Sequence, residues 1–288
     1  MVENSFPLKW GSRTYVMGIL NITSDSFSGD GLIRNGYSEE TIIEQARSFI
    51  KAGVDILDIG GESTRPGADT IYEDMEMERV LPVIRAIRRD NPDILLSIDT
   101  YKSRVAREAI AAGADWINDV WGLKGDPRMA STAADLKVPI ILMHNRSKPA
   151  DVQLQQNLGG RYIGVEYTNL IEDIKTELMD CVSIGLEAGI EREKIVLDPG
   201  IGFGKTVEQN LEIINRLNEI RTLGFPIVLG TSRKSFIGYT LTLPPDARLE
   251  GTAATVAIGI SKGADIVRVH DVPEMVRVAR MSDAIVRR

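Results

Sequence analysis

Acidic, amide and basic side chains recur where short apolar stretches of this sequence end. Asp99, Asn118 and Asp198 offer two carboxylates and a carboxamide, and Lys234 adds a cation. Carboxylates and carboxamides together can match a ligand edge that presents adjacent hydrogen-bond donors and an acceptor. These residue types therefore predict a site for a polar ligand.

A second group of residues is suited to anions. Arg268 and His270 stand two positions apart, so on a strand they would point to the same face and could converge on a phosphate. Ser235 follows Lys234 at the predicted start of a helix, where free N–H groups and the positive end of the helix dipole attract a carboxylate. The alternative for His270 is a histidine whose hydrogen bonds are satisfied within the core.

The elements that must position these residues follow from eight short, nearly continuous apolar runs, which are typical of strands buried on both faces of a parallel sheet. The runs are Tyr15 to Leu20, Ile56 to Ile59, Ile94 to Ile98, Trp116 to Val120, Pro139 to Met143, Ile195 to Leu197, Pro226 to Leu229 and Ile266 to Val269. Amphipathic stretches between them predict helices, which include Glu39 to Ala52, Glu73 to Arg89, Ser103 to Ala112, Tyr162 to Ala188, Val207 to Leu223 and Leu249 to Lys262. Several end at a glycine, a common C-terminal helix signal: Gly53, Gly113, Gly189 and Gly263.

This alternation of strands and helices predicts the α/β class and a single-domain TIM-type (β/α)8 barrel over residues 1–288. An open doubly wound sheet is the alternative fold. Chemistry in such barrels lies where the strands end, and every predicted strand here ends on polar residues. Helix N-capping would explain one Asp or Asn at a time. It explains poorly two His, a Lys and three Asp on one rim.

Composition narrows the class of protein. The formal net charge of -7 and the interspersed charges argue against a nucleic-acid or anionic-membrane surface, so anion sites should be local. The single cysteine, Cys181, excludes an internal disulfide and fits a reducing cytoplasm; as a small buried hydrophobe it has no expected catalytic role. No apolar run approaches the ~20 residues that span a bilayer, which predicts a soluble protein.

The glycine-rich segment at residues 199–206 invites comparison with nucleotide-binding loops. A Walker loop needs glycine where Pro199 stands, and the dinucleotide fingerprint needs glycine where Lys205 stands. Both interpretations fail. The glycines instead predict a tight turn that brings backbone close to a bound ring.

Several segments, in this order along the chain, resemble the dihydropteroate synthase family. They are MGILNITSDSFSGDG (17 to 31), GGESTRPGA (60 to 68), SIDT (97 to 100), INDV (117 to 120), LDPGIGFGKT (197 to 206), GTSRKSFIG (230 to 238) and RVHD (268 to 271). The resemblance implies condensation of a pterin methyl diphosphate with 4-aminobenzoate in folate biosynthesis. Two alternatives are a pterin-dependent methyltransferase acting on a corrinoid partner and a noncatalytic pterin carrier; neither needs the Ser-Thr-Arg-Pro loop or the Ser-Arg-Lys-Ser segment.

The resemblance also implies roles for individual residues. The pterin would be bound by Asp99, Asn118, Met143, Asp198, Phe203 and Lys234. The diphosphate would be bound by Arg268 and His270 together with Asn21, which helps to hold a Mg²⁺ ion. For Met143, ordinary packing in the barrel core is the alternative. His144 either contacts the ligand or supports a residue that does.

The same resemblance implies a pocket for 4-aminobenzoate and a homodimer. Ser235 would anchor the carboxylate, and the pocket walls would be Phe27, Thr64, Arg65 and Pro66. The catalytic residues would be Lys234, Asp99 and an aspartate of the first loop, either Asp25 or Asp30. The choice stays open because the first loop departs from the family pattern, with Ser24 in place of a proline and Gly-Asp-Gly in place of Asp-Gly-Gly. The homodimer would form through helices near the C-terminal barrel strands.

Overall fold

The computed structural model describes residues 8–22, 39–63, 70–148, 151–155, 157–163 and 166–287. Its main sheet has eight parallel strands, which are β1 (Tyr15–Asn21), β2 (Ile56–Gly60), β3 (Leu95–Asp99), β4 (Trp116–Asp119), β5 (Ile140–Met143), β8 (Ile195–Asp198), β9 (Val228–Leu229) and β10 (Ile266–Val269). They pair in the order β8-β5-β4-β3-β2-β1-β10-β9. A parallel bridge between Leu197 and Ile227 joins the two ends, so the sheet closes into a barrel. The predicted barrel is confirmed, and the open doubly wound sheet is wrong.

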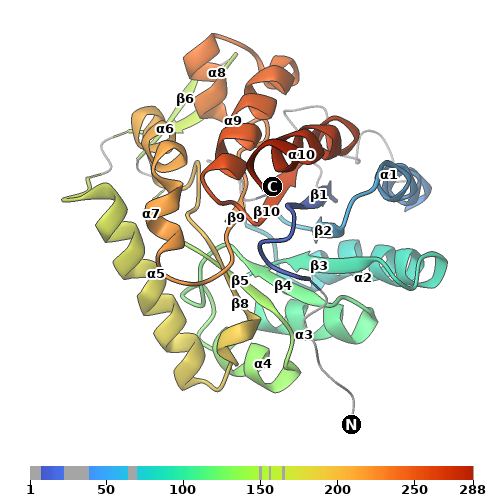
Figure 1. Cartoon of the computed structure of the whole chain (residues 1–288). Helices are drawn as coiled ribbons and strands as arrows, with labels where there is room; N and C mark the ends of the chain where they lie inside the picture. Colours follow the sequence, from blue (N-terminus) through green and yellow to red (C-terminus); the bar gives the residue numbers. More distant parts are fainter. Residues whose placement is uncertain are drawn as a thin grey trace.

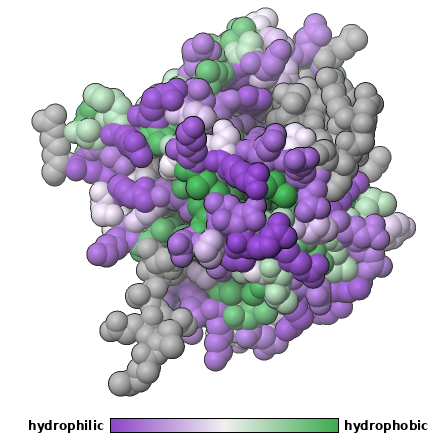
Figure 2. All heavy atoms as spheres, turned by 90° about the vertical axis from the view of Figure 1, so that its right-hand side faces the viewer, coloured by the Kyte–Doolittle hydropathy of each residue, from purple (hydrophilic) through white to green (hydrophobic). Residues whose placement is uncertain are grey.

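Helices surround the strands, as Figure 1 shows. They are α1 (Glu39–Ala52), α2 (Glu73–Asp90), α3 (Ser103–Ala112), α4 (Met129–Leu136), α5 (Leu170–Glu187), α6 (Val207–Asn215), α7 (Leu217–Arg221), α8 (Ser235–Leu241), α9 (Leu249–Ser261) and α10 (Val272–Val286), with short 3-10 turns at Arg192–Lys194 and Pro245–Ala247. Hydrophilic side chains predominate on the face that carries α1 and α2 (Figure 2). The amphipathic pattern thus turns the apolar side of these helices to the sheet. None of the described helices is long and apolar enough to cross a membrane.

The predicted glycine signals lie where helices end. Gly53, Gly113, Gly189 and Gly263 all have positive φ, between 93° and 117°. A residue with a side chain is strained in this left-handed region, whereas glycine is not. Each glycine therefore stops its helix and turns the chain toward the next strand.

Two predicted helices differ from those observed. The stretch expected to begin at Tyr162 becomes helical only at Leu170, because Tyr162 lies in an antiparallel hairpin of β6 (Val152–Gln155) and β7 (Gly159–Tyr162). Asn169 then caps α5 by accepting a hydrogen bond from the backbone N–H of Glu172. The stretch from Val207 to Leu223 divides at Arg216, whose guanidinium pairs with glutamates on both sides of the break.

The barrel interior changes from apolar to polar along its axis. At the amino ends of the strands it is filled by a buried cluster that includes Met17, Ile56, Trp116, Ile141 and Val196. Side chains two positions apart share a face of a strand, and on four of the strands the next inward position is polar. These are Asp58 on β2, Asn118 on β4, Asp198 on β8 and Arg268 on β10. The polar layer lies toward the carboxyl ends, where barrels of this kind carry their sites.

Candidate functional site

The strand register brings four of the inward positions into one row. Asn21 of β1 pairs with Gly60 of β2, Gly60 with Asp99 of β3, and Asp99 with Asn118 of β4. A Cβ at Gly60 would lie 3.5 Å from Cβ of Asp99 and 3.7 Å from Oδ1 of Asn21. Glycine therefore leaves open the space between these two side chains, which face the same end of the barrel.

Arg268 is held between two carboxylates at the base of this row. Its Nε donates to Oδ2 of Asp58 over 2.6 Å, and its Nη2 donates to Oδ2 of Asp99 over 2.6 Å. Asn118 donates to the same oxygen of Asp58 over 3.0 Å. The other predicted diphosphate ligand, His270, has its ring Nδ1 3.0 Å from the hydroxyl of Ser232.

Burial shifts the protonation of this group. It raises the pKa of Asp99 to about 7, against the opposing effect of Arg268 and with a further rise from the nearby Asp58 charge. The two carboxylates raise the pKa of Arg268, so the guanidinium stays charged. Within the described residues, Oδ1 of both Asp58 and Asp99 is buried without a hydrogen-bond partner. Buried acceptors of this kind are costly unless a ligand supplies donors to them.

Asp198 and Lys234 occupy the other side of the barrel mouth. The backbone N–H of Gly200 donates to Oδ1 of Asp198 over 2.7 Å, and the ammonium of Lys234 donates to the carbonyl of Ile201. Burial raises the pKa of Asp198 and lowers that of Lys234 to about 8, although each group offsets the shift of the other. The ammonium lies 4.7 Å from the centre of the Phe203 ring. The loop after β8 therefore contacts both Asp198 and Lys234.

Glycine also gives these side chains room. A Cβ at Gly230 would lie within 4.0 Å of the ammonium of Lys234, Cβ of Arg268 and Oδ2 of Asp198. These three residues therefore surround one backbone position at the end of β9. Met143 pairs in register with Asp198 and is 4% exposed, which agrees with both barrel packing and a place at the floor of the site.

Ser235 is the first residue of α8 and directly follows Lys234. The preceding Arg233 has a positive φ of 55°, and its guanidinium pairs with Asp271. The carbonyl of Arg233 accepts a hydrogen bond from buried Arg248 over 2.9 Å. This bend, held from two sides, places Lys234 and Ser235 side by side at the barrel mouth.

Six predicted site residues lie outside the described part of the chain. Asp25, Phe27 and Asp30 fall within residues 23–38, and Thr64, Arg65 and Pro66 fall within residues 64–69. Their roles stay predictions. Of the predicted residues that are described, Asn21, Asp99, Asn118, Met143, Asp198, Phe203, Lys234, Ser235, Arg268 and His270 all lie at or near the carboxyl ends of strands.

Sequence reasoning missed Asp58, which is fully buried at the centre of the polar layer. An aspartate inside the otherwise apolar run ILDIG was the available signal, since a buried carboxylate needs a partner. It also gave no role to Lys205, whose ammonium lies 2.9 Å from Nδ1 of His144, the residue after β5. Asp119 ends β4 as a structural carboxylate, accepting from the backbone N–H groups of Trp121 and Leu123.

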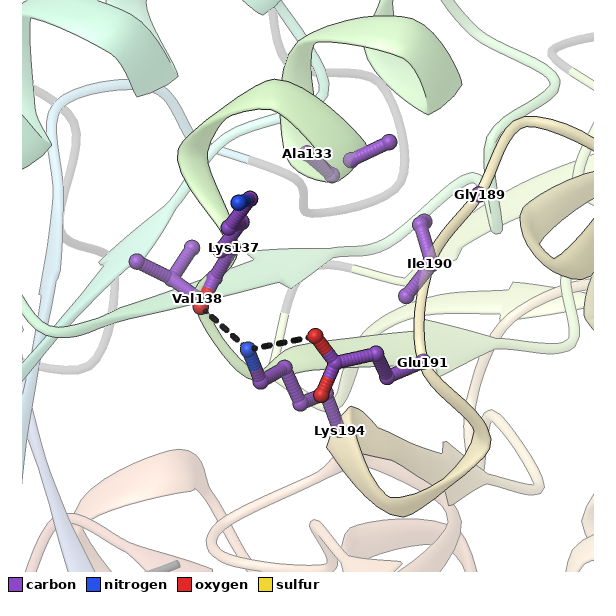
Figure 3. Close-up of a pocket in the computed structure, with 8 residues that line it drawn as sticks. Ala133, Lys137, Val138, Gly189, Ile190, Glu191 and Lys194 are labelled. Atoms are coloured by element: carbon purple, nitrogen blue, oxygen red, sulfur yellow. Dashed lines mark hydrogen bonds and ion pairs between the residues drawn. The ribbon is translucent and has the colours of Figure 1, made fainter. Parts of the chain in front are cut away.

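A separate hollow lies at the opposite end of the barrel. It measures about 40 Å³ and is lined by residues of α4, of the segment after α4 and of the segment before β8, including Lys137, Ile190 and Lys194 (Figure 3). Lys194 donates to the carbonyl of Lys137 over 2.8 Å. These residues precede β5 and β8, so the hollow lies away from the polar layer and is not part of the candidate site.

Comparison with known proteins matches this geometry to one family. The family model described as pterin binding enzyme matches residues 17–270. The dihydropteroate synthase of Clostridium beijerinckii is 52% identical over 279 residues, covering 96% of each chain.

Solved structures give the same result. The dihydropteroate synthase of Clostridium difficile, solved in the presence of pteroic acid, superposes with a TM-score of 0.86 at 47% identity, covering 98% of this chain and 100% of that one. The enzyme of Xanthomonas albilineans, solved with 4-aminobenzoic acid, gives 0.83 at 34% identity, covering 96% and 94%. With its barrel and its matching length, the chain belongs to the pterin binding enzymes and, within them, to the dihydropteroate synthases.

Proposed function

We propose that the polar layer of the barrel and its rim carry out the dihydropteroate synthase reaction through the residues described above. In this reaction the bond between the pterin methylene and the diphosphate breaks, and the arylamine nitrogen of 4-aminobenzoate bonds to the methylene and loses a proton. The observation that carries the proposal is the register that places Asn21, Asp99 and Asn118 in one row opposite Asp198 and Lys234. Diphosphate release on mixing the protein with both substrates and Mg²⁺ tests it; no release would overturn it.

The pterin is bound by its pyrimidine edge. Asp198 accepts hydrogen bonds from the ring donors, the carboxamide of Asn118 forms hydrogen bonds with the adjacent ring atoms, and Lys234 donates to a ring acceptor. Asp99, with an unpartnered buried oxygen, completes the pocket. Phe203 and Met143 are its apolar walls. Carboxylates near the methylene stabilise positive charge as the diphosphate leaves, which favours a dissociative path.

The diphosphate leaves from the rim near Asn21, Arg268 and His270. The carboxamide of Asn21 stands at the end of β1 beside open space at Gly60, and its oxygen is a donor atom of the kind that Mg²⁺ prefers. One protein oxygen is enough because Mg²⁺ takes its other ligands from water and phosphate. Mg²⁺ at Asn21 would neutralise charge on the leaving diphosphate. Arg268 and His270 add cationic and donor groups to the same end of the barrel.

The 4-aminobenzoate is held by Ser235, whose hydroxyl and backbone N–H suit a carboxylate. Thr64, Arg65, Pro66 and Phe27 would enclose its ring, and Asp25 or Asp30 would assist at the reacting centre. Since the amine attacks directly, no nucleophilic residue of the protein is required.

Ser235→Ala should weaken binding of the aminobenzoate substrate selectively. We expect the KM for this substrate to rise about tenfold to 100-fold, because a hydrogen bond to a charged group contributes about 1.5–3 kcal/mol, while the Kd of the pterin substrate changes less than about twofold. Steady-state kinetics with saturating pterin diphosphate measure the first quantity and calorimetry the second. An unchanged KM would show that another group holds the carboxylate.

Binding of the pterin should weaken at alkaline pH as Lys234 loses its proton. With a pKa of about 8, we expect the Kd to rise roughly tenfold between pH 8 and pH 9.5. Loss of the Lys234 proton should not destabilise the folded protein. The pKa of Lys234 is lowered on folding, so between pH 8 and 10.5 the unfolded chain binds more protons than the folded one. The contribution of Lys234 to the free energy of unfolding therefore rises with pH.

Calorimetric titrations across this range measure the pH effect. In Lys234→Arg the cation keeps its proton, so the alkaline weakening should disappear even if overall affinity is lower. A wild-type Kd that stays constant to pH 9.5 would contradict the role of the ammonium.

The protein acts as a homodimer in the cytoplasm, with an interface on α9 and α10. Apolar side chains are exposed on these packed helices: Ile258 is 47%, Met281 62% and Ile285 60% exposed. In the proposed dimer a second copy of the chain would cover these side chains. Sedimentation of the wild type and of Met281→Glu tests the interface, since a charge there should shift a dimer toward the monomer.

The methyltransferase alternative is not favoured, because relatives of nearly full length are dihydropteroate synthases.

A further inference from the structure

Lys205 is a fully buried lysine near the end of residues 199–206, called here the β8 loop, and its side chain lies behind the turn that this loop makes. Its side chain is 2% exposed. The ammonium donates to the carbonyls of Gly200 and Phe203, each over 2.9 Å, and lies 2.9 Å from Nδ1 of His144. Burial lowers its pKa well below that of a free lysine. A buried amine is costly, so its retention calls for a role that these contacts explain.

His144 connects this lysine to helix α5. It follows β5, and its Nε2 lies 3.0 Å from Oε2 of Glu177. Arg146 donates to the other oxygen of Glu177 over 2.8 Å. Burial lowers the pKa of His144 to about 4, so the ring is neutral. A neutral ring can accept from Lys205 at Nδ1 and keep its proton at Nε2, the nitrogen that lies closest to the Glu177 carboxylate.

Two glycines bring the β8 loop into close contact with the segment that carries His144. Gly200 and Gly204 have positive φ values of 69° and 62°. A Cβ at Gly200 would lie 1.9 Å from the carbonyl oxygen of His144, and one at Gly204 would lie 2.3 Å from the carbonyl carbon of Arg146. The loop therefore packs backbone to backbone against residues 144–146, with Lys205 filling the space between them.

The opposite side of the same loop carries the pterin pocket. The backbone N–H of Gly200 donates to Asp198, and the carbonyl of Ile201 accepts from Lys234. Carbonyls of one short turn are thus bound by a lysine in the site and by a lysine behind it. A shift of the turn would move both groups that hold the pterin.

We infer that Lys205 is a positioning residue for the pterin pocket: held by His144 and Glu177, it fixes the β8 loop and thereby sets Asp198 and Lys234. The inference rests on the proposed function, in which those two residues bind the pterin. Lys205 itself touches no substrate. Its expected effect is on pterin affinity, and the aminobenzoate site at Ser235 on α8 should be affected much less.

Lys205→Met tests this by keeping the length of the side chain and removing its donors. We expect the Kd of the pterin diphosphate to rise at least about tenfold, while the KM for the aminobenzoate substrate at saturating pterin changes less than about twofold. Lys194→Met is the matched control, because that lysine is also buried and donates to a carbonyl (Figure 3) but directly precedes β8, at the end of the barrel away from the polar layer. It should lower the melting temperature and leave the pterin Kd unchanged.

An unchanged pterin Kd in folded Lys205→Met would overturn the inference. If that variant does not fold, Glu177→Gln takes its place: it keeps the shape of the side chain, removes the charge facing His144, and should raise the pterin Kd about threefold. No change there would equally refute the inference. Asp198→Asn distinguishes failure of the inference about Lys205 from failure of the proposed function, since normal pterin binding by that variant would refute the proposed function.

Discussion

Asp198→Asn should abolish measurable binding of the pterin substrate, with a Kd at least about 100-fold higher than that of the wild type, or nearly 3 kcal/mol. The carboxylate has one oxygen engaged by the backbone N–H of Gly200 and lies on the same side of the barrel mouth as the ammonium of Lys234. A carboxamide of the same shape loses the charge and turns an N–H₂ group toward either the Gly200 donor or the ring donors. Because two donors then oppose each other in a buried site, the loss should exceed that of one hydrogen bond.

Asp119→Asn is the control for this variant. Asp119 is also a buried carboxylate at a strand end, but both of its oxygens accept from the backbone of the following turn. Its substitution should lower the melting temperature and leave the pterin Kd within about twofold. Calorimetry on both folded variants measures the contrast. Equal affinities in the two would refute the assignment of Asp198.

Arg268→Met should destabilise the protein more than any other single change in the polar layer, by about 3–5 kcal/mol at pH 8. The guanidinium binds Asp58 and Asp99, each over 2.6 Å, in a layer with little access to water. Methionine fills similar volume but leaves two buried carboxylates close together. Pterin condensation should be lost as well, because the same variant removes a cation from the site.

The loss of stability in Arg268→Met should be greater at higher pH. The pKa of Asp99 is raised to about 7 even beside Arg268, and removal of the cation should raise it further. A carboxyl group with a raised pKa favours the folded state below its pKa and loses this contribution as pH rises through it. The stability difference between variant and wild type should therefore be smaller at pH 5 than at pH 8.

Urea denaturation at the two pH values measures this difference. Arg216→Met is the control: that arginine pairs with Glu212 and Glu219 on the surface, and its removal should leave no measurable pH-dependent deficit. An Arg268→Met protein as stable as the wild type at pH 8 would show that the carboxylates do not need the guanidinium.

Much of the fold could be predicted because its signals are local. Runs such as ILDIG and IVLD lie buried on both faces of the sheet, and such strands are apolar at nearly every position. Glycines such as Gly113 stop helices through their own backbone freedom. The hairpin at β6 and β7 was missed because its pairing joins residues whose sequence carries no strong alternation.

The site was predictable to the extent that strand ends are predictable. Asp99, Asn118 and Asp198 follow apolar runs, and parallel strands of a barrel bring their carboxyl ends to one rim. The resemblance of the loops then indicated which ligands the rim would take. By themselves, however, these residues do not reveal which of them touch.

The sequence by itself determined the eight strands, the polar rim and the family to which the chain belongs, because the burial of a strand and the polar residues at its end are encoded by residues close together in the sequence. Only the tertiary structure decided that Arg268 lies between Asp58 and Asp99, and that Lys205 meets His144 beneath the β8 loop. These contacts join residues 61 to 210 positions apart. Closure of the barrel brings them within hydrogen-bond distance, and burial there makes their charges interdependent.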